Sequence, residues 1–229
     1  MCEHFVARAD EPFRIDELWQ MTERLERHGI AGFGWGAAWL DAAGRLAAHR
    51  DVRAFRDDPG REDVGHLETT SLLVHLRRPS RLSTLGAPDT QPFLDPRGRF
   101  AFSHNGDLRH FEPWRRRFRA EGRIHGRADS EVGQRWLEDE WRSDEPVGHL
   151  LAALHDAFGG EANLAAIDEG GAVHMYAGNG ENPVFAFRLG RIRIVSTGIY
   201  SLDRSLFRFV AQGAADRRLL ARRTTATLE

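Results

Sequence analysis

The spacing of apolar residues predicts helices at several places along the chain. The clearest stripes lie in residues 16–28 and 146–158, where apolar side chains recur about every 3.6 residues. The stripes consist of Leu18, Met21 and Leu25 in the first segment and Val147, Leu150, Leu151, Leu154 and Phe158 in the second. Further helices are predicted over residues 111–120, 130–142 and 201–212.

Short apolar or alternating runs predict strands on both sides of the central helical region. These runs are residues 2–8, 33–40, 45–50, 71–77, 99–104, 162–168, 172–177, 183–189 and 191–196. Strands, then helices, then strands again favour an α+β domain of antiparallel sheets covered by helices, rather than a doubly wound parallel sheet. Residues 57–63 and 78–95 are predicted loops, and Asn105-Gly106-Asp107 is predicted to form a tight turn.

Composition narrows the classes of protein that fit this pattern. The 229 residues carry a net charge of −2, with 41% hydrophobic and 29% charged residues. This balance is typical of a globular domain, and the near-neutral charge argues against a general nucleic-acid binder. No apolar run approaches the ~20 residues of a membrane-spanning helix, and the first residues lack a signal-peptide pattern. We therefore expect a single cytoplasmic domain over residues 1–229, with neither a membrane nor a nucleic-acid partner.

The chain contains one cysteine, Cys2, which excludes an internal disulfide and a cysteine-rich zinc site. If the initiator Met1 is removed, the thiol and the α-amine belong to the same residue. An α-amine has a pKa of about 8, so its neutral form can accept the thiol proton without a histidine base. Cys2 is thus a candidate nucleophile. The alternatives are a catalytic pair of Cys2 with His75 or His104, and a terminal cysteine without a role.

Three other segments carry groups suited to amide chemistry. The planar guanidinium of Arg77, at the end of an apolar strand, suits two-point capture of a carboxylate, although surface arginines are also common. The Asn105 amide and the Gly106 N–H could donate hydrogen bonds to an oxyanion, the alternative being the turn named above. Asp129, at a helix start, could bind an ammonium group or act as a helix N-cap.

A metal site is not expected, although the chain has 11 histidines. His149 and His155 do not share a helix face, His104 and His110 lack a third ligand, and no His-Glu-x-x-His pattern occurs. No cofactor is expected either. The arginine-rich residues 114–119 are assigned to a solvated helix face rather than to a nucleic-acid surface.

In their order and spacing, these motifs resemble the class II glutamine amidotransferase domain, the cysteine branch of the N-terminal-nucleophile (Ntn) hydrolases. The chain is most similar to the small stand-alone members, which include γ-glutamyl hydrolases. The matching segments, within about residues 1–200, are Met1-Cys2, Gly34-Trp35-Gly36, His75-Leu76-Arg77, Asp89-Thr90-Gln91-Pro92-Phe93, His104-Asn105-Gly106-Asp107-Leu108 and Ala128-Asp129-Ser130-Glu131.

The resemblance implies a four-layer αββα sandwich and a set of roles in the cleavage of an amide. The implied roles are nucleophile for Cys2, oxyanion hole for Asn105 and Gly106, carboxylate binding for Arg77, ammonium binding for Asp129, and substrate-pocket positions for Trp35, Gly36 and His75.

The substrate implied is glutamine or a small γ-glutamyl amide. Either ammonia passes to a separate ammonia-accepting subunit, or the protein hydrolyses a γ-glutamyl conjugate by itself; a homo-oligomer is also left open. Two departures from the family pattern lie near the expected pocket, at Glu3-His4 and at Arg78-Pro79-Ser80. They keep open a catalytically silent binding or regulatory member of the same fold.

Overall fold

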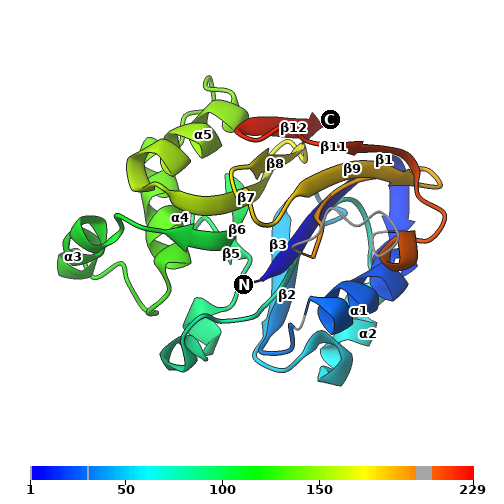
Figure 1. Ribbon diagram of the computed structural model, residues 1–229, viewed down its shortest axis with the longest axis horizontal. Helices are drawn as coiled ribbons and strands as arrows, with labels where there is room; N and C mark the ends of the chain where they lie inside the picture. The colour runs from blue at the N-terminus through cyan, green and yellow to red at the C-terminus, as the bar shows by residue number, and fades with distance from the viewer. Residues whose placement is uncertain (1, 30, 200–207) are drawn as a thin grey trace.

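The central strands bury both of their faces, as strands in a stacked pair of sheets must. In β1 (Glu3–Arg14), Phe5 and Ala7 belong to one apolar core whereas Val6 belongs to another. The computed structural model describes residues 2–29, 31–199 and 208–229. In these residues two antiparallel sheets pack against each other (Figure 1).

The larger sheet has seven strands among the described residues, and the smaller sheet has five. In spatial order, the larger sheet consists of β11 (Ala215–Leu219), β9 (Val184–Leu189), β10 (Ile192–Thr197), β1, β4 (Glu68–Leu76), β2 (Trp35–Leu40) and β3 (Leu46–Asp51). The smaller sheet consists of β12 (Thr224–Leu228), β8 (Val173–Ala177), β7 (Gly160–Asp168), β6 (Phe100–Leu108) and β5 (Phe93–Leu94).

Helices cover the outer face of each sheet, and three apolar cores separate the layers. The larger sheet packs on η1 (Ile15–Leu18), α1 (Trp19–His28), η2 (Phe55–Asp57) and α2 (Gly60–Gly65). The smaller sheet packs on α3 (Glu112–Ala120), α4 (Asp129–Glu140) and α5 (Val147–Phe158). The third core lies between the sheets. The predicted α+β class and αββα sandwich are therefore confirmed (Figure 1).

The predicted turn at Asn105-Gly106-Asp107 is wrong, because β6 continues through it. Asn105 pairs with Asn163 of β7, and Gly106 pairs with Ala162. Glycine is required here for a close approach between strands rather than for a hairpin. A Cβ atom at Gly106 would lie 1.7 Å from the carbonyl oxygen of Glu161, and the φ angle of 131° is one that L side chains rarely adopt.

Other differences concern short elements. The predicted loop at residues 57–63 contains part of α2, and the 78–95 segment holds η3 (Leu82–Thr84), η4 (Ala87–Asp89) and β5. The C-terminal segment forms the edge strands β11 and β12. Most of the helix predicted over residues 201–212 lies outside the described residues.

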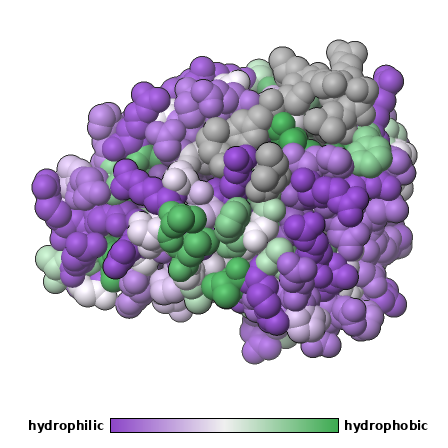
Figure 2. Space-filling model, turned by 60° about the horizontal axis from the view of Figure 1, so that its bottom comes forward, coloured by the Kyte–Doolittle hydropathy of each residue, from purple (hydrophilic) through white to green (hydrophobic). Residues whose placement is uncertain are grey.

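The described residues contain no helix that is long and apolar enough to span a membrane. Figure 2 shows one face of the molecule, on which hydrophilic residues predominate and hydrophobic residues gather in small groups.

Candidate active site

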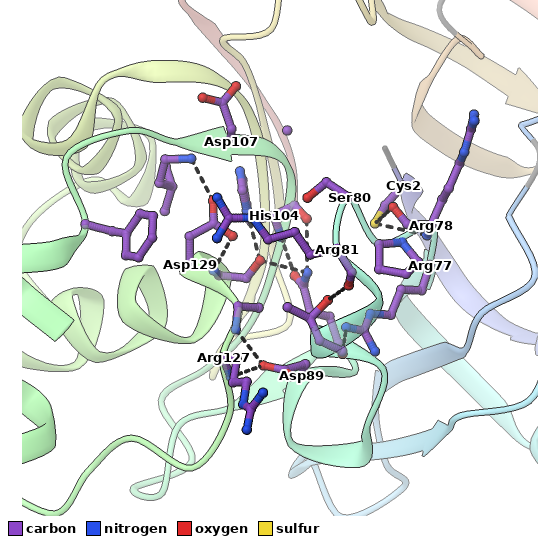
Figure 3. A pocket seen from close by; sticks show the side chains of 18 of the residues that line it. Cys2, Arg77, Arg78, Ser80, Arg81, Asp89, His104, Asp107, Arg127 and Asp129 are labelled. Atoms are coloured by element: carbon purple, nitrogen blue, oxygen red, sulfur yellow. Dashed lines mark hydrogen bonds between the residues drawn. The ribbon is translucent and has the colours of Figure 1, made fainter.

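A cavity of about 270 Å³ lies where four distant segments of the chain meet (Figure 3). Cys2 immediately precedes β1, and Arg77 immediately follows β4. Gly106 and Leu108 come from the last part of β6, and Asp129 opens α4. The sandwich thus assembles one pocket from the ends of strands in both sheets and from one helix start.

Cys2 contributes the thiol of this pocket. Its Sγ lies 3.3 Å from the backbone nitrogen of Arg78 and 3.7 Å from the carbonyl oxygen of the same residue. Burial raises the pKa of the Cys2 thiol, an effect that the Arg78 N–H and the charge of Arg77 oppose only in part. The thiol is therefore protonated at neutral pH and needs a base before it can attack a carbonyl group.

Neither histidine of the alternative catalytic pair makes a hydrogen bond to the Cys2 sulfur in the part of the chain that the structure describes. The Nδ1 atom of His104 lies 3.0 Å from the Ser130 hydroxyl. The His75 ring is fully buried near the ring of His4, with 6.4 Å between ring centroids. Burial lowers the pKa of both His75 and His104, so both rings are neutral at neutral pH.

Asn105 links the two sheets at the pocket. Its side chain is fully buried, and Nδ2 donates a hydrogen bond to the carbonyl oxygen of Cys2. This contact joins β6 of the smaller sheet to the residue that precedes β1 of the larger one.

Arg77 is a buried cation close to Cys2, with only 3% of its surface exposed. Its guanidinium donates to the carbonyl oxygens of Gly86, at 3.4 Å, and Thr84, both in the segment that follows β4. Burial lowers the pKa of Arg77, while Cys2 and Asp89 act in the opposite direction. An arginine nevertheless stays charged, so the pocket holds a fixed positive charge close to the thiol.

The Asp129 carboxylate joins the helix start to the end of β6. Oδ2 accepts a hydrogen bond of 2.8 Å from Leu108 N, and Oδ1 accepts one of 2.9 Å from Ser130 N. Asp129 is the first residue of α4 rather than its N-cap, which is Ala128. Its carboxylate accepts from one backbone donor of β6 and one of the helix, and it also lines the pocket.

Asp89 is a pocket residue to which the sequence analysis assigned no role. Its Oδ1 accepts hydrogen bonds from the backbone nitrogens of Arg127, at 2.6 Å, and Ala128, at 2.7 Å. A Cβ atom at Gly126 would lie 2.2 Å from the same oxygen, so a glycine is needed for this approach. Asp89 thereby fixes the turn that presents Asp129, and the signal for it was the long proline-containing loop of residues 78–95.

Gln91 is a second residue that sequence reasoning missed. Its side chain accepts a hydrogen bond of 2.6 Å from His104 N and donates one of 3.2 Å to His104 O. It also donates to the Ser130 hydroxyl, at 3.1 Å. Gln91 thus fixes the strand just before Asn105 against the first turn of α4.

The prediction that Trp35, Gly36 and His75 occupy pocket positions is not met, because none of them lines this cavity. Alternation along β2 directs Trp35 to the helix-covered face, where its Nε1 donates to Asp58 at 3.0 Å. Gly36 acts indirectly: a Cβ atom there would lie 2.4 Å from the carbonyl oxygen of Gln91. Glycine therefore lets the segment that carries Gln91 pack onto β2.

Glu3, noted above only as a departure from the family pattern, is a fully buried carboxyl group next to the candidate nucleophile. Its Oε2 accepts hydrogen bonds from Asn182 Nδ2, at 3.3 Å, and from the Thr197 hydroxyl. Burial raises the pKa of Glu3 to about 7, although these hydrogen bonds lower it. The position after Cys2 therefore holds a carboxyl group that titrates near neutral pH.

One group of side chains in the described residues has the spacing of metal ligands, namely His49, Asp51 and Asp58. The guanidinium of Arg53 already lies 2.7 Å from Asp51 and 2.8 Å from Asp58. The hydrogen bonds of this arginine lower the pKa of Asp51 to about 2. The cluster has its own cation, so it is an ion-pair network that also holds Trp35 through Asp58.

A family model for class II glutamine amidotransferases matches residues 1–197, and the chain belongs to this family. The two-sheet sandwich, with a cysteine at the start of a central strand, agrees with this assignment. No curated protein matches the chain significantly.

Among solved structures, the chain is similar to the glutamine phosphoribosylpyrophosphate amidotransferase of B. subtilis complexed with ADP and GMP. That match has a TM-score of 0.74 and 16% identity, and it covers 99% of this chain and 49% of that one. A structure described as the allosteric regulatory enzyme of purine biosynthesis matches with a TM-score of 0.73 and 16% identity, covering 99% of this chain and 48% of that one. A glutamine aminotransferase class-II domain protein from Silicibacter pomeroyi matches with a TM-score of 0.63 and 20% identity, covering 99% of this chain and 94% of that one.

The chain spans about half the length of the first two structures. At these identities the likeness establishes the fold, and what those proteins bind or produce does not transfer with it.

Proposed function

We propose that this protein cleaves the side-chain amide of glutamine or of a γ-glutamyl amide through a thioester on Cys2. The observation that carries the proposal is the meeting of Cys2, Arg77, Gly106 and Asp129 at one cavity, from segments far apart in the sequence. Asn105 is buried beside that cavity and donates to the carbonyl oxygen of Cys2. Membership of the class II glutamine amidotransferase family supports the same chemistry.

The base in this mechanism is the α-amine of Cys2 after removal of Met1. The raised pKa of the thiol makes a base necessary, and the candidate histidines His75 and His104 make no hydrogen bond to the sulfur among the described residues. A neutral α-amine on the same residue takes the thiol proton, directly or through one water molecule. The thiolate then attacks the side-chain carbonyl carbon and forms a tetrahedral adduct.

The negative charge of that adduct develops on the former carbonyl oxygen. Asn105 Nδ2 and the Gly106 N–H are the donors that we assign to it, an arrangement worth ~10²–10³-fold per donor in comparable sites. The protonated amine of Cys2 gives its proton to the departing nitrogen, the carbon–nitrogen bond breaks, and ammonia or an amine leaves. Water then attacks the γ-glutamyl thioester, the amine accepts one proton of that water, and glutamate and the free thiol are restored.

The charged ends of the γ-glutamyl group have complementary partners in the pocket. Arg77 is assigned to the α-carboxylate and Asp129 to the α-ammonium, which matches the fixed charges described above. Arg77 now donates to the carbonyl oxygens of Thr84 and Gly86, so a bound carboxylate would share or replace these contacts.

The partners in this proposal are glutamine or a γ-glutamyl small molecule and, where ammonia is transferred, a separate ammonia-accepting subunit. A homo-oligomer and a cytoplasmic location stay predictions from the sequence.

Three measurements on the purified protein test the proposal. Intact mass shows whether Met1 is removed, which the amine mechanism requires. Glutamate release from glutamine and from a panel of γ-glutamyl amides measures turnover, and a diazoketone analogue of glutamine should label Cys2. The variant Cys2→Ala should fold normally and release no glutamate. Normal turnover by Cys2→Ala, or by protein that retains Met1, would overturn the mechanism; binding without turnover in the processed protein would favour the catalytically silent alternative.

A further inference from the structure

The pocket carries more positive charge than a γ-glutamyl group needs. Five arginines line it: Arg77, Arg78, Arg81, Arg109 and Arg127. Three aspartates, at positions 89, 107 and 129, oppose them. A γ-glutamyl group has one positive and one negative end, so Arg77 and Asp129 suffice for it in the function proposed above.

The remaining carboxylates do not neutralise the remaining arginines. Asp107 lies 3.4 Å from Arg109 and forms an exposed pair with it. The Oδ1 atom of Asp89 is occupied by backbone N–H groups. Within residues 2–29, 31–199 and 208–229, the guanidinium groups of Arg78, Arg81 and Arg127 have neither an ion pair nor a hydrogen bond, and all three line the pocket.

These three arginines line the same cavity as Cys2. Figure 3 shows Arg78 beside Cys2 with its side chain extending away from Asp89, Arg127 on the opposite side next to Asp89, and Arg81 between them. The backbone nitrogen of Arg78 is 3.3 Å from the sulfur, so its side chain starts within reach of the bond that is cleaved. Because all three arginines line the same cavity as Cys2, a group that extends from the cleaved bond along the cavity meets positive charge.

We propose that the protein prefers γ-glutamyl amides whose leaving amine carries an anionic group, a carboxylate or a phosphate, over glutamine itself. This inference rests on the proposed function and adds the substrate class. Guanidinium groups suit carboxylates and phosphates because they donate two parallel hydrogen bonds, and a cleft lined by one sign of charge concentrates the opposite sign. Ammonia, the leaving group of glutamine, uses none of these arginines. Hydrolysis adds one water molecule and yields glutamate and the free anionic amine, with no other reactant.

The experiment compares four γ-glutamyl amides, which differ in the charge of the leaving amine, with glutamine, using processed wild-type protein. The leaving amines are glutamate, 2-aminoethylphosphonate, the neutral ethylamine and the cationic 1,4-diaminobutane. We expect kcat/KM for the two anionic amides to exceed that for the ethylamide by about tenfold or more, and the diaminobutane amide to be the poorest. The advantage should shrink as salt rises from 50 to 500 mM, because the charges are partly exposed. The first two amides distinguish carboxylate from phosphate.

Substitutions then assign the preference to these residues. The triple variant R78Q/R81Q/R127Q should lower the ratio of anionic to neutral kcat/KM toward unity. A matched control is Arg119→Gln, an exposed arginine on α3 outside the pocket, which should leave the ratio unchanged. Equal cleavage of the anionic and neutral amides, or an unchanged ratio in the triple variant, would overturn the inference and leave the proposed function intact. If no amide is cleaved and Cys2 is not acylated, the proposed function itself fails.

Discussion

Replacing Glu3 by glutamine should make the stability of this protein less dependent on pH. The Glu3 carboxyl is fully buried, and its pKa is about 7 in the folded protein against an ordinary value of 4.5. Glutamine keeps the shape of the side chain and cannot ionise. It therefore removes the titration with little change in packing.

The sign and size follow from the two pKa values. Below about pH 4.5 the carboxyl is protonated in both states, and its contribution to stability is fully present. As the pH rises, the unfolded chain releases the proton first, so stability is lost progressively until the folded state also ionises above about pH 7. At ~1.4 kcal/mol per tenfold difference in proton affinity, the complete loss is about 3 kcal/mol, of which about 2.5 kcal/mol falls between pH 5 and pH 8.

Urea unfolding at pH 5, 6, 7 and 8 measures this effect. The unfolding free energy of the wild type should fall by about 2.5 kcal/mol relative to that of Glu3→Gln across this range. Glu11→Gln is the matched control, since Glu11 is an exposed carboxyl on the same strand; it should follow the wild type. A constant difference between wild type and Glu3→Gln at all four pH values would refute the reasoning, because it would mean that Glu3 does not titrate in this range.

Three further substitutions test the pocket and the strand that supports it. Asn105→Ala should lower kcat by ~10²–10³-fold, measured as glutamate release, and a kcat within threefold of wild type would remove it from the oxyanion site. Arg77→Lys should raise KM more than it lowers kcat, since a single ammonium cannot replace a two-point contact; an unchanged KM would leave Arg77 a structural role only. Gly106→Ala should lower Tm markedly because its Cβ would meet a backbone carbonyl at 1.7 Å, whereas Gly86→Ala, with its nearest atom at 3.6 Å, should not; similar Tm values for both would contradict the strand geometry.

The layered fold could be predicted because its signals are local and repeated. The stripe from Val147 to Phe158 forms α5 almost as predicted, and the apolar run around Leu73 forms β4. The order of the predicted strands and helices along the chain was then compatible with only a few layered arrangements of antiparallel sheets and helices. The family resemblance added the stacking of two sheets, which periodicity alone does not specify.

Only some residues of the candidate site could be predicted, because the others act through contacts between segments that are far apart in the sequence. Cys2, Arg77, Asn105, Gly106 and Asp129 were proposed from an ordered set of motifs, and the fold brings them to one region; their roles stay predictions. Asp89 and Gln91 act by holding backbone groups far away in sequence, and no local pattern reports such contacts.

Two misassignments have the same physical origin: the sequence did not specify which neighbouring elements surround a given residue of a strand. Trp35 was assigned to the pocket, but its place in β2 directs it to the opposite face, where apolar residues pack under the helices. Asn105-Gly106 matches a common turn sequence, yet the same glycine serves a close contact with β7. A dipeptide that permits an unusual backbone geometry does not by itself indicate which partner requires it.

The position of the thiol relative to its proposed oxyanion donor depends on how closely the two sheets pack. Cys2 precedes a strand of the larger sheet and Asn105 belongs to the smaller one, so their hydrogen bond spans the layer between them. That layer is built mainly from alanine and valine, whereas phenylalanine, leucine and tryptophan fill the two outer cores. Small side chains permit a close approach, and a larger residue would force the sheets apart because protein cores leave little free volume. The composition of the inner core is therefore part of the catalytic geometry in the proposed mechanism, although none of its apolar residues touches the pocket.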